Sequence, residues 1–265
     1  MNDLPLRFGM PFLLETPDLG AALALCSKLK LDFIELNQNF PECLTENLAP
    51  AELREAAVHE GIFFTYHLDD ALNFCDFKPK VREAYVQTAL DTINWAAEAG
   101  VETINLHLPR GGVVTLPDGP HYLYSYHQKA FMENVRSFRD RCSEAAQGRS
   151  IRLAIENTEG WADYELEAVA ELLRSPVFGL TLDIGHDDAT GGRDLRWIES
   201  RKDRLIHMHA HDGVGQTNHR AFGSGDIPLQ DRLNLAAEVN ATIVIETKTA
   251  AALEESVEWL RKHRG

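Results

Sequence analysis

Three histidines alternate with apolar residues in the C-terminal third of the sequence, at His207, His209 and His211, and Asp212-Gly213 follows them. Side chains of a β-strand alternate between its two faces, so the three imidazoles would share one face. A single buried histidine is most often a core residue that hydrogen-bonds to the backbone. The packing of a core strand gives no reason for three imidazoles on one face. The three histidines therefore predict a strand end that carries metal ligands.

Acidic residues and histidines also end the other apolar runs of the chain. These residues are His67, His107, Glu156, Asp183 with His186, and Glu246. Each has an ordinary explanation by itself, since an acid there can cap a turn, begin a helix or pair with a neighbouring lysine such as Lys248. Whether they form a site depends on the fold that brings the strand ends together.

The elements that position these residues alternate along the whole chain. Apolar runs typical of strands cover residues 6–14, 33–37, 62–67, 103–107, 151–157, 178–183, 204–211 and 242–247. Helical patterns cover residues 19–29, 50–60, 80–99, 121–146, 165–173, 194–200, 229–239 and 250–261. Residues 109–120 and 213–225 are rich in glycine, proline or polar residues and are expected to be loops.

Strands that alternate with helices imply a parallel sheet. Eight such units in 265 residues predict a single (β/α)8 TIM barrel domain over residues 1–265. The alternative is a doubly wound open sheet, which would have a glycine-rich first turn. Gly9-Met10-Pro11 does not supply that turn, so the barrel is favoured.

A TIM barrel places its chemistry at the carboxyl ends of its strands, so the acids and imidazoles would converge there. Several carboxylates in one small space repel one another unless a cation holds them. A divalent metal bound by Glu156, Asp183, His209 and Glu246 removes that cost. This donor set suits Mn, Mg, Co or Zn, and ligand type alone does not choose among them.

The charge and composition of the chain limit the kinds of partner and the location to be expected. The formal net charge is −15, which argues against nucleic acid and against an anionic membrane surface. The N-terminus has no secretory pattern, and no apolar run reaches membrane length, so we expect a cytoplasmic protein. Cys26, Cys43, Cys75 and Cys142 are far apart and suggest free thiols. Barrels of this size often associate, so a homo-oligomer is compatible with the sequence.

Three residues are weaker candidates for contact with a substrate. Arg110 follows His107 in a Gly-Gly loop and could meet an anionic or polyol substrate, although an arginine there is usually solvated. Trp161 could form a wall of the pocket, and His211 continues the histidine series. The loop from Ala221 to Asp226, with Gly223-Ser224-Gly225, would lie beside the histidine-rich strand.

The motifs together resemble the xylose isomerase-like TIM barrels. They are Ala154-Ile-Glu-Asn-Thr158, Leu182-Asp-Ile-Gly-His186, His207-Met-His-Ala-His-Asp212, Gly223-Ser-Gly225 and Ile245-Glu-Thr247. This group contains sugar isomerases and epimerases, inosose and dehydroshikimate dehydratases, and the type IV AP endonucleases. The resemblance spans His67 to Glu246 and implies a metal site of Glu156, Asp183, His209 and Glu246.

The endonuclease branch of this group uses more ligands and holds three zinc ions. His67, His107, His186 and His219 match its additional histidines and are therefore candidates for further metal ligands or for substrate binding. The branch has an aspartate two residues before the last histidine, where this chain has Thr217. The third zinc site would then lack one ligand.

These observations predict an enzyme, a divalent-metal-dependent isomerase or epimerase of a sugar, polyol or keto-sugar. It would act by proton transfer through a metal-stabilised enediolate, with Glu156 and Glu246 as the groups that remove and return the proton. Two alternatives use the same ligands. One is a zinc-cluster phosphodiesterase resembling the type IV AP endonucleases, and the other is a metal-dependent dehydratase of the inosose or dehydroshikimate type.

Overall fold

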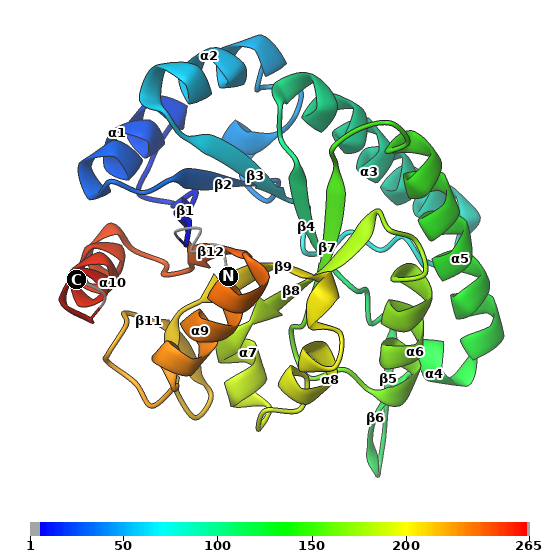
Figure 1. Cartoon of the computed structure of the whole chain (residues 1–265). Coiled ribbons are helices and arrows are strands. Elements are labelled where there is room, and N and C mark those ends of the chain that lie inside the picture. The colour runs from blue at the N-terminus through cyan, green and yellow to red at the C-terminus, as the bar shows by residue number, and fades with distance from the viewer. Residues whose placement is uncertain (1–5, 264–265) are drawn as a thin grey trace.

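Eight strands of the described residues pair in parallel and close into a barrel in the order β1-β12-β9-β8-β7-β4-β3-β2 (Figure 1). The structure is a computed structural model that describes residues 6–263. The barrel strands are β1 (Phe8–Pro11), β2 (Phe33–Asn37), β3 (Phe63–His67), β4 (Thr103–His107), β7 (Arg152–Glu156), β8 (Phe178–Asp183), β9 (Leu205–Ala210) and β12 (Thr242–Ile245). The predicted TIM barrel is confirmed.

Helices surround the barrel (Figure 1). They are α1 (Leu19–Leu29), α2 (Pro50–Glu60), α3 (Pro79–Ala99), α4 (Leu123–Tyr126), α5 (Gln128–Ala145), α6 (Asp163–Leu172), α7 (Ile184–Ala189), α8 (Leu195–Glu199), α9 (Leu229–Val239) and α10 (Ala250–His263). The side chain of Asp18 caps α1 by accepting the N–H of Ala21 at 2.8 Å. Gly100 ends α3 in the left-handed conformation with φ of 78°.

Two segments predicted as loops contain β-hairpins instead. The first hairpin joins β5 (Val113–Leu116) to β6 (Gly119–Tyr122), projects from the barrel in Figure 1, and displaces the start of the helix predicted over 121–146. The second joins β10 (Asp212–Val214) to β11 (Thr217–Arg220). The loop predictions were wrong because such short strands are stabilised by pairing with each other, and composition alone does not reveal that pairing.

The barrel interior is unusually polar. Barrel cores are normally filled with branched aliphatic side chains. Here the hydroxyl of Thr181 on β8 donates to Oδ1 of Asn105 on β4 at 2.6 Å, and the hydroxyl of Thr65 donates to Oε2 of Glu35 at 3.0 Å. These four side chains are buried. The buried apolar cluster is built from side chains of the strands and of the surrounding helices.

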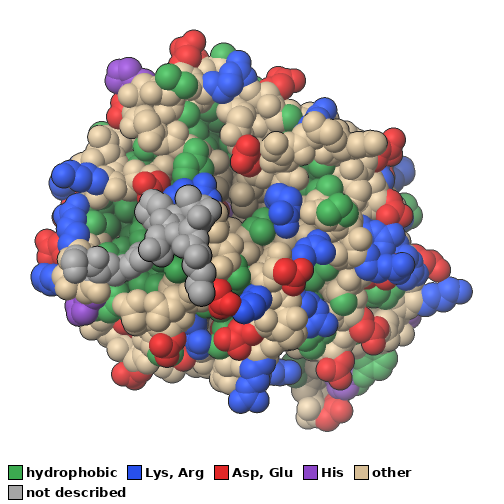
Figure 2. Space-filling view, in the orientation of Figure 1, with side chains coloured by type: hydrophobic (Ala, Val, Ile, Leu, Met, Phe, Trp, Pro, Cys, Tyr) green, Lys and Arg blue, Asp and Glu red, His purple; other side chains and the backbone are tan. Residues whose placement is uncertain are grey.

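The outer surface seen in Figure 2 carries acidic and basic side chains intermixed. Within residues 6–263 no helix combines the length and the hydropathy needed to cross a membrane. The four cysteines are buried free thiols, as the sequence suggested, at Cys26, Cys43, Cys75 and Cys142.

Candidate active site at the carboxyl ends of the barrel strands

The four residues predicted to bind a metal lie together at the carboxyl ends of the strands. One ligand atom from each lies within 4.8 Å of the others, and the four are Glu156, Asp183, His209 and Glu246. The register brings them together, because His209 of β9 is paired with Asp183 of β8 on one side and with Val244 of β12 on the other. Glu246 directly follows β12 and reaches the same space.

The donor atoms of this group fit a divalent cation. Nδ1 of His209 and Oε2 of Glu246 are buried and have no hydrogen-bond partner among the described residues. Nδ1 lies 3.2 Å from Oε1 of Glu156 and 3.4 Å from Oε2 of Glu246. Unpartnered buried polar atoms are rare, since each has given up its hydrogen bonds to water. Three carboxylates and one imidazole are suitable ligands for a divalent metal ion.

Glu156 is oriented by an amide outside the predicted set. Nδ2 of Asn105 donates a hydrogen bond to Oε2 of Glu156, while Thr181 holds the other end of the same amide. Glu156 is 2% exposed, and Asn105 and Thr181 are fully buried. The only signal in the sequence was a polar amide within the apolar run of residues 103–107. Asn105 therefore fixes one carboxylate oxygen of Glu156.

Asp183 is oriented by contacts from three elements. Its Oδ1 accepts the N–H of His186 at 2.7 Å, which makes Asp183 the N-cap of α7. Nε2 of His211 lies 3.1 Å from the same oxygen, and Nδ1 of His211 accepts the backbone N–H of His219 at 2.8 Å. The ring proton of a neutral His211 is thus on Nε2 and points to Asp183. Asn157 exchanges two hydrogen bonds with the backbone of Asp183.

Glu246 lies at the rim and has a cationic neighbour. Nζ of Lys248 is 2.7 Å from Oε1 of Glu246, the pairing that the sequence offered as an ordinary explanation for this acid. Nδ1 of His219 lies 3.7 Å from Oε2 of Glu246. His211, His219 and Glu246 form another group whose ligand atoms lie within 4.8 Å of one another.

Two further histidines extend the site on the side of Glu156. Nδ1 of His67 donates to the carbonyl oxygen of Leu68 at 2.6 Å, because a carbonyl oxygen can only accept. The other ring nitrogen, Nε2, faces Oε2 of Glu156 at 3.3 Å. Nε2 of His107 lies 3.5 Å from the same Oε2. His67, His107 and Glu156 form a separate group of ligand atoms within 4.8 Å. His186 lies farther out, with Nε2 3.9 Å from Oδ2 of Asp183.

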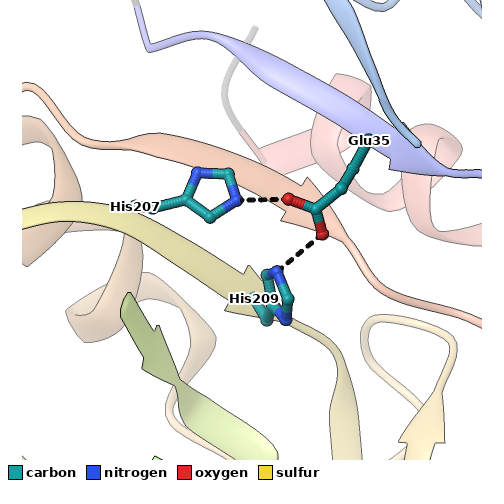
Figure 3. A group of neighbouring side chains, drawn as sticks. All are labelled: Glu35, His207 and His209. Carbon is teal, nitrogen blue, oxygen red and sulfur yellow. Dashed lines mark hydrogen bonds and ion pairs between the residues drawn. The ribbon is translucent and has the colours of Figure 1, made fainter. Parts of the chain in front are cut away.

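A buried acid on β2 contacts the imidazoles of β9 from below the rim (Figure 3). Oε2 of Glu35 is 2.9 Å from Nε2 of His207, and Oε1 is 2.8 Å from Nε2 of His209. The second contact is an ion pair rather than an aligned hydrogen bond. Glu35 was not among the predicted site residues, although an acid within the apolar run 33–37 was a visible signal.

The charges of the site compensate one another. Burial raises the pKa of Glu156 and Glu246. His209, together with His107 beside Glu156 and with Lys248 beside Glu246, more than offsets burial and holds both pKa values well below the ordinary value. Burial lowers the pKa of His209, yet the surrounding carboxylates raise it well above its ordinary value. The pKa of His67 is raised to about 9, because Glu156 outweighs burial. The pocket therefore stabilises positive charge.

Two of the weaker substrate candidates face protein partners. Nε of Arg110 donates to Oε1 of Glu165 at 2.9 Å, and its other nitrogens contact Glu159 and the backbone. The Trp161 ring packs edge-to-face on Trp197 with ring centres 5.7 Å apart. Neither side chain belongs to the clusters of ligand atoms described above. The third candidate, His211, contacts the site through Asp183.

The closed parallel barrel and the ligand cluster at its strand ends define a class of (β/α)8 proteins with a candidate metal centre. The family described as "Xylose isomerase-like TIM barrel" matches residues 23–263, and the chain belongs to this family. The resemblance inferred from the sequence motifs is confirmed. No curated protein matches the chain.

Solved structures share this fold over nearly the whole chain. One is a D-tagatose 3-epimerase-like protein, with a TM-score of 0.79 and 22% identity over 97% of this chain and 96% of the other. A second is the apo form of 3-keto-D-glucoside 4-epimerase from E. coli, with a TM-score of 0.77 and 17% identity over 97% and 100%. A third is the IolI protein with a bound zinc atom, with a TM-score of 0.72 and 16% identity over 97% and 96%.

Proposed function

We propose that this protein is a divalent-metal-dependent isomerase or epimerase of a sugar or keto-sugar. The observation that carries the proposal is the convergence of Glu156, Asp183, His209 and Glu246 within 4.8 Å at the barrel mouth. The similarity in fold to a D-tagatose 3-epimerase-like protein and to 3-keto-D-glucoside 4-epimerase supports this reaction class. The zinc atom in the IolI protein, which shares this fold, is in keeping with a metal-dependent activity.

The residues of this chain would divide the chemistry between a cation and two bases. A divalent cation held by the four residues would polarise a carbonyl oxygen and the neighbouring hydroxyl of the substrate, and so acidify the C–H between them. Glu156 and Glu246 have pKa values held below the ordinary range, so both are ionised near neutral pH and can accept a proton. One would remove the proton and the other would return it.

The surrounding side chains hold these two acids in place. Asn105 binds Oε2 of Glu156 and Lys248 binds Oε1 of Glu246, which leaves one oxygen of each facing His209. Positioned acids and bases accelerate proton transfer by about 10²–10⁴-fold. His186 at the rim would hydrogen-bond to a substrate hydroxyl.

The test is exchange of substrate hydrogen with solvent. The protein is stripped with a chelator, reloaded with Mn²⁺, Co²⁺, Mg²⁺ or Zn²⁺, and incubated with a panel of ketoses in D₂O while NMR follows deuterium at the carbon beside the carbonyl. Deuterium incorporation that needs the metal supports the proposal. Glu246→Gln should lower turnover by about 10²-fold or more. Full turnover of that variant would remove Glu246 from the mechanism.

A second candidate is the zinc-cluster phosphodiesterase. It is favoured by the separate ligand group of His67, His107 and Glu156, which could hold a second ion beside the first. An ion held there by His67, His107 and Glu156 would supply activation of a water for attack on a phosphodiester. The zinc content per chain separates the candidates, since one ion suits the isomerase and two or three suit the hydrolase. Nicking of DNA that contains an abasic site tests the second candidate directly.

A further inference from the structure

The barrel interior holds an acid that is not part of the proposed ligand set. Glu35 on β2 is 3% exposed, and its two carboxylate oxygens contact three side chains, as Figure 3 shows in part. Oε1 faces Nε2 of His209 at 2.8 Å, and Oε2 faces Nε2 of His207 at 2.9 Å and the hydroxyl of Thr65 at 3.0 Å.

The contacts continue away from the barrel mouth. Nδ1 of His207 lies 2.6 Å from the hydroxyl of Thr242 on the neighbouring strand. His207 is fully buried, and both of its ring nitrogens have partners. A continuous set of contacts thus runs through the barrel from Thr242 to His207, Glu35 and His209. We call these four side chains the interior relay.

The interior relay is itself not a good metal site. Ligand atoms of Glu35, His207 and His209 do lie within 4.8 Å of one another. However, both nitrogens of His207 and Oε2 of Glu35 already have hydrogen-bonding partners. Three atoms here have no hydrogen-bond partner among the described residues: Nδ1 and Nε2 of His209 and Oε2 of Glu246. Nε2 of His209 forms an ion pair with Glu35, whereas Nδ1 faces Oε2 of Glu246 at 3.4 Å. A cation would therefore lie above His209, and Glu35 would contact the opposite edge of the same ring.

We propose that Glu35 is a positioning residue that fixes the orientation of His209 as a metal ligand. The negative charge of Glu35 beside Nε2 favours a proton on that nitrogen. Nδ1, which lies 3.2 Å from Glu156 and 3.4 Å from Glu246, would then be the nitrogen whose lone pair binds the cation. Metal-binding histidines commonly have such a carboxylate on their second nitrogen, which orients the ring and makes the ligand more basic. His207 and Thr65 hold the Glu35 carboxylate in place.

Stability alone does not account for this arrangement. A buried carboxylate is costly unless every oxygen is paired, and apolar side chains of the same volume usually serve a barrel core at least as well. In the interior relay, the polar side chains of Thr242, His207 and Glu35 instead form a chain of contacts that ends at the ring of His209. A specific orientation of His209 is what this arrangement provides. The proposal rests on the metal site of the proposed function.

The experiment compares Glu35→Gln with a matched control, Asp194→Asn. Both replace a buried carboxylate by its amide, but Asp194 binds the backbone N–H of Trp161 and contacts no residue of the ligand cluster. The dissociation constant for Mn²⁺ is measured by competition with a chromophoric chelator, with metal content per chain determined in parallel. Glu35→Gln should weaken binding by about 10- to 100-fold, whereas Asp194→Asn should stay within about threefold of the unaltered protein.

A spectroscopic readout separates positioning from general destabilisation. In the Zn²⁺-loaded protein, ¹⁵N NMR should show His209 with its proton on Nε2, and Glu35→Gln should shift or broaden that signal. Should Glu35→Gln fail to fold, Glu35→Asp is the second variant, because it keeps the charge but withdraws it from the ring. It should weaken Mn²⁺ binding by at least threefold and should leave the proton on Nε2.

The outcomes are distinct. Equal Mn²⁺ affinity of the unaltered protein and a folded Glu35 variant overturns the positioning role and leaves the proposed function intact. Absence of divalent-metal binding by the unaltered protein overturns both. A weakened Glu35 variant in a protein that binds metal but exchanges no substrate hydrogen supports the positioning role and counts against the proposed function alone.

Discussion

Binding of a divalent cation should raise the thermal stability of this protein. Glu156, Asp183 and Glu246 converge on one space. The positive charges that face them include His209, His67 beside Glu156 and the rim residue Lys248 beside Glu246. A cation there satisfies the unpartnered atoms of His209 and Glu246 and reduces the repulsion between the carboxylates. The folded state alone brings these ligands together, so the binding free energy adds to the free energy of unfolding.

The expected size follows from mass action. At a free-metal concentration of 100 times the dissociation constant, binding adds about 2.7 kcal/mol to the free energy of unfolding. For a chain of this length each kcal/mol moves the Tm by roughly 2–4 °C, so the rise should be roughly 5–11 °C. If Glu246→Gln weakens binding about a hundredfold, the same metal concentration adds only about 0.4 kcal/mol, or roughly 1–2 °C.

Differential scanning calorimetry of chelated and reloaded protein measures both values. The metal-free Tm of Glu246→Gln should fall below that of the unaltered protein, because the ion pairs of Glu246 with His209 and Lys248 are lost. Two results would refute the reasoning. One is the absence of any rise with Mn²⁺, Co²⁺, Mg²⁺ and Zn²⁺, and the other is an equal rise in Glu246→Gln.

Three further predictions follow from neighbouring residues. An added Cβ at Gly185 would lie 1.8 Å from Cε1 of His211, and His211 orients Asp183. Gly185→Ala should therefore weaken Mn²⁺ binding by about tenfold or more. Unchanged affinity in a chelator competition would contradict this prediction. Burial raises the pKa of Asp187, so the stability of the protein should fall as the pH rises through that pKa. Asp187→Asn should therefore flatten the dependence of the urea midpoint on pH between pH 3 and 7. An unaltered pH profile would count against this reasoning. Arg110→Met removes the ion-pair partner of the buried Glu165, which keeps only a backbone hydrogen bond from Ala162, and should cost about 3 kcal/mol in urea unfolding with KM unchanged. A raised KM at full stability would instead indicate that Arg110 contacts the substrate.

The sequence by itself determined the barrel and the residues at its strand ends. Alternating apolar runs and helical patterns specify strands and helices through local preferences, and Gly100 and Asp18 mark helix boundaries through backbone geometry. The parallel barrel then requires that residues ending separate strands meet at one face. For this reason Glu156 and His209, 53 positions apart in the printed sequence, could be assigned to one site before any coordinates.

Tertiary structure alone decided what lies beneath and beside that site. Glu35, Asn105 and Thr181 occupy apolar runs, and their roles depend on which strand lies opposite across the barrel, which no local pattern encodes. The hairpins within residues 109–120 and 213–225 likewise depend on pairing between short segments with weak preferences of their own. The physical reason is the same in both cases: local sequence sets where a side chain can point, and only packing across the closed barrel sets which partner it meets.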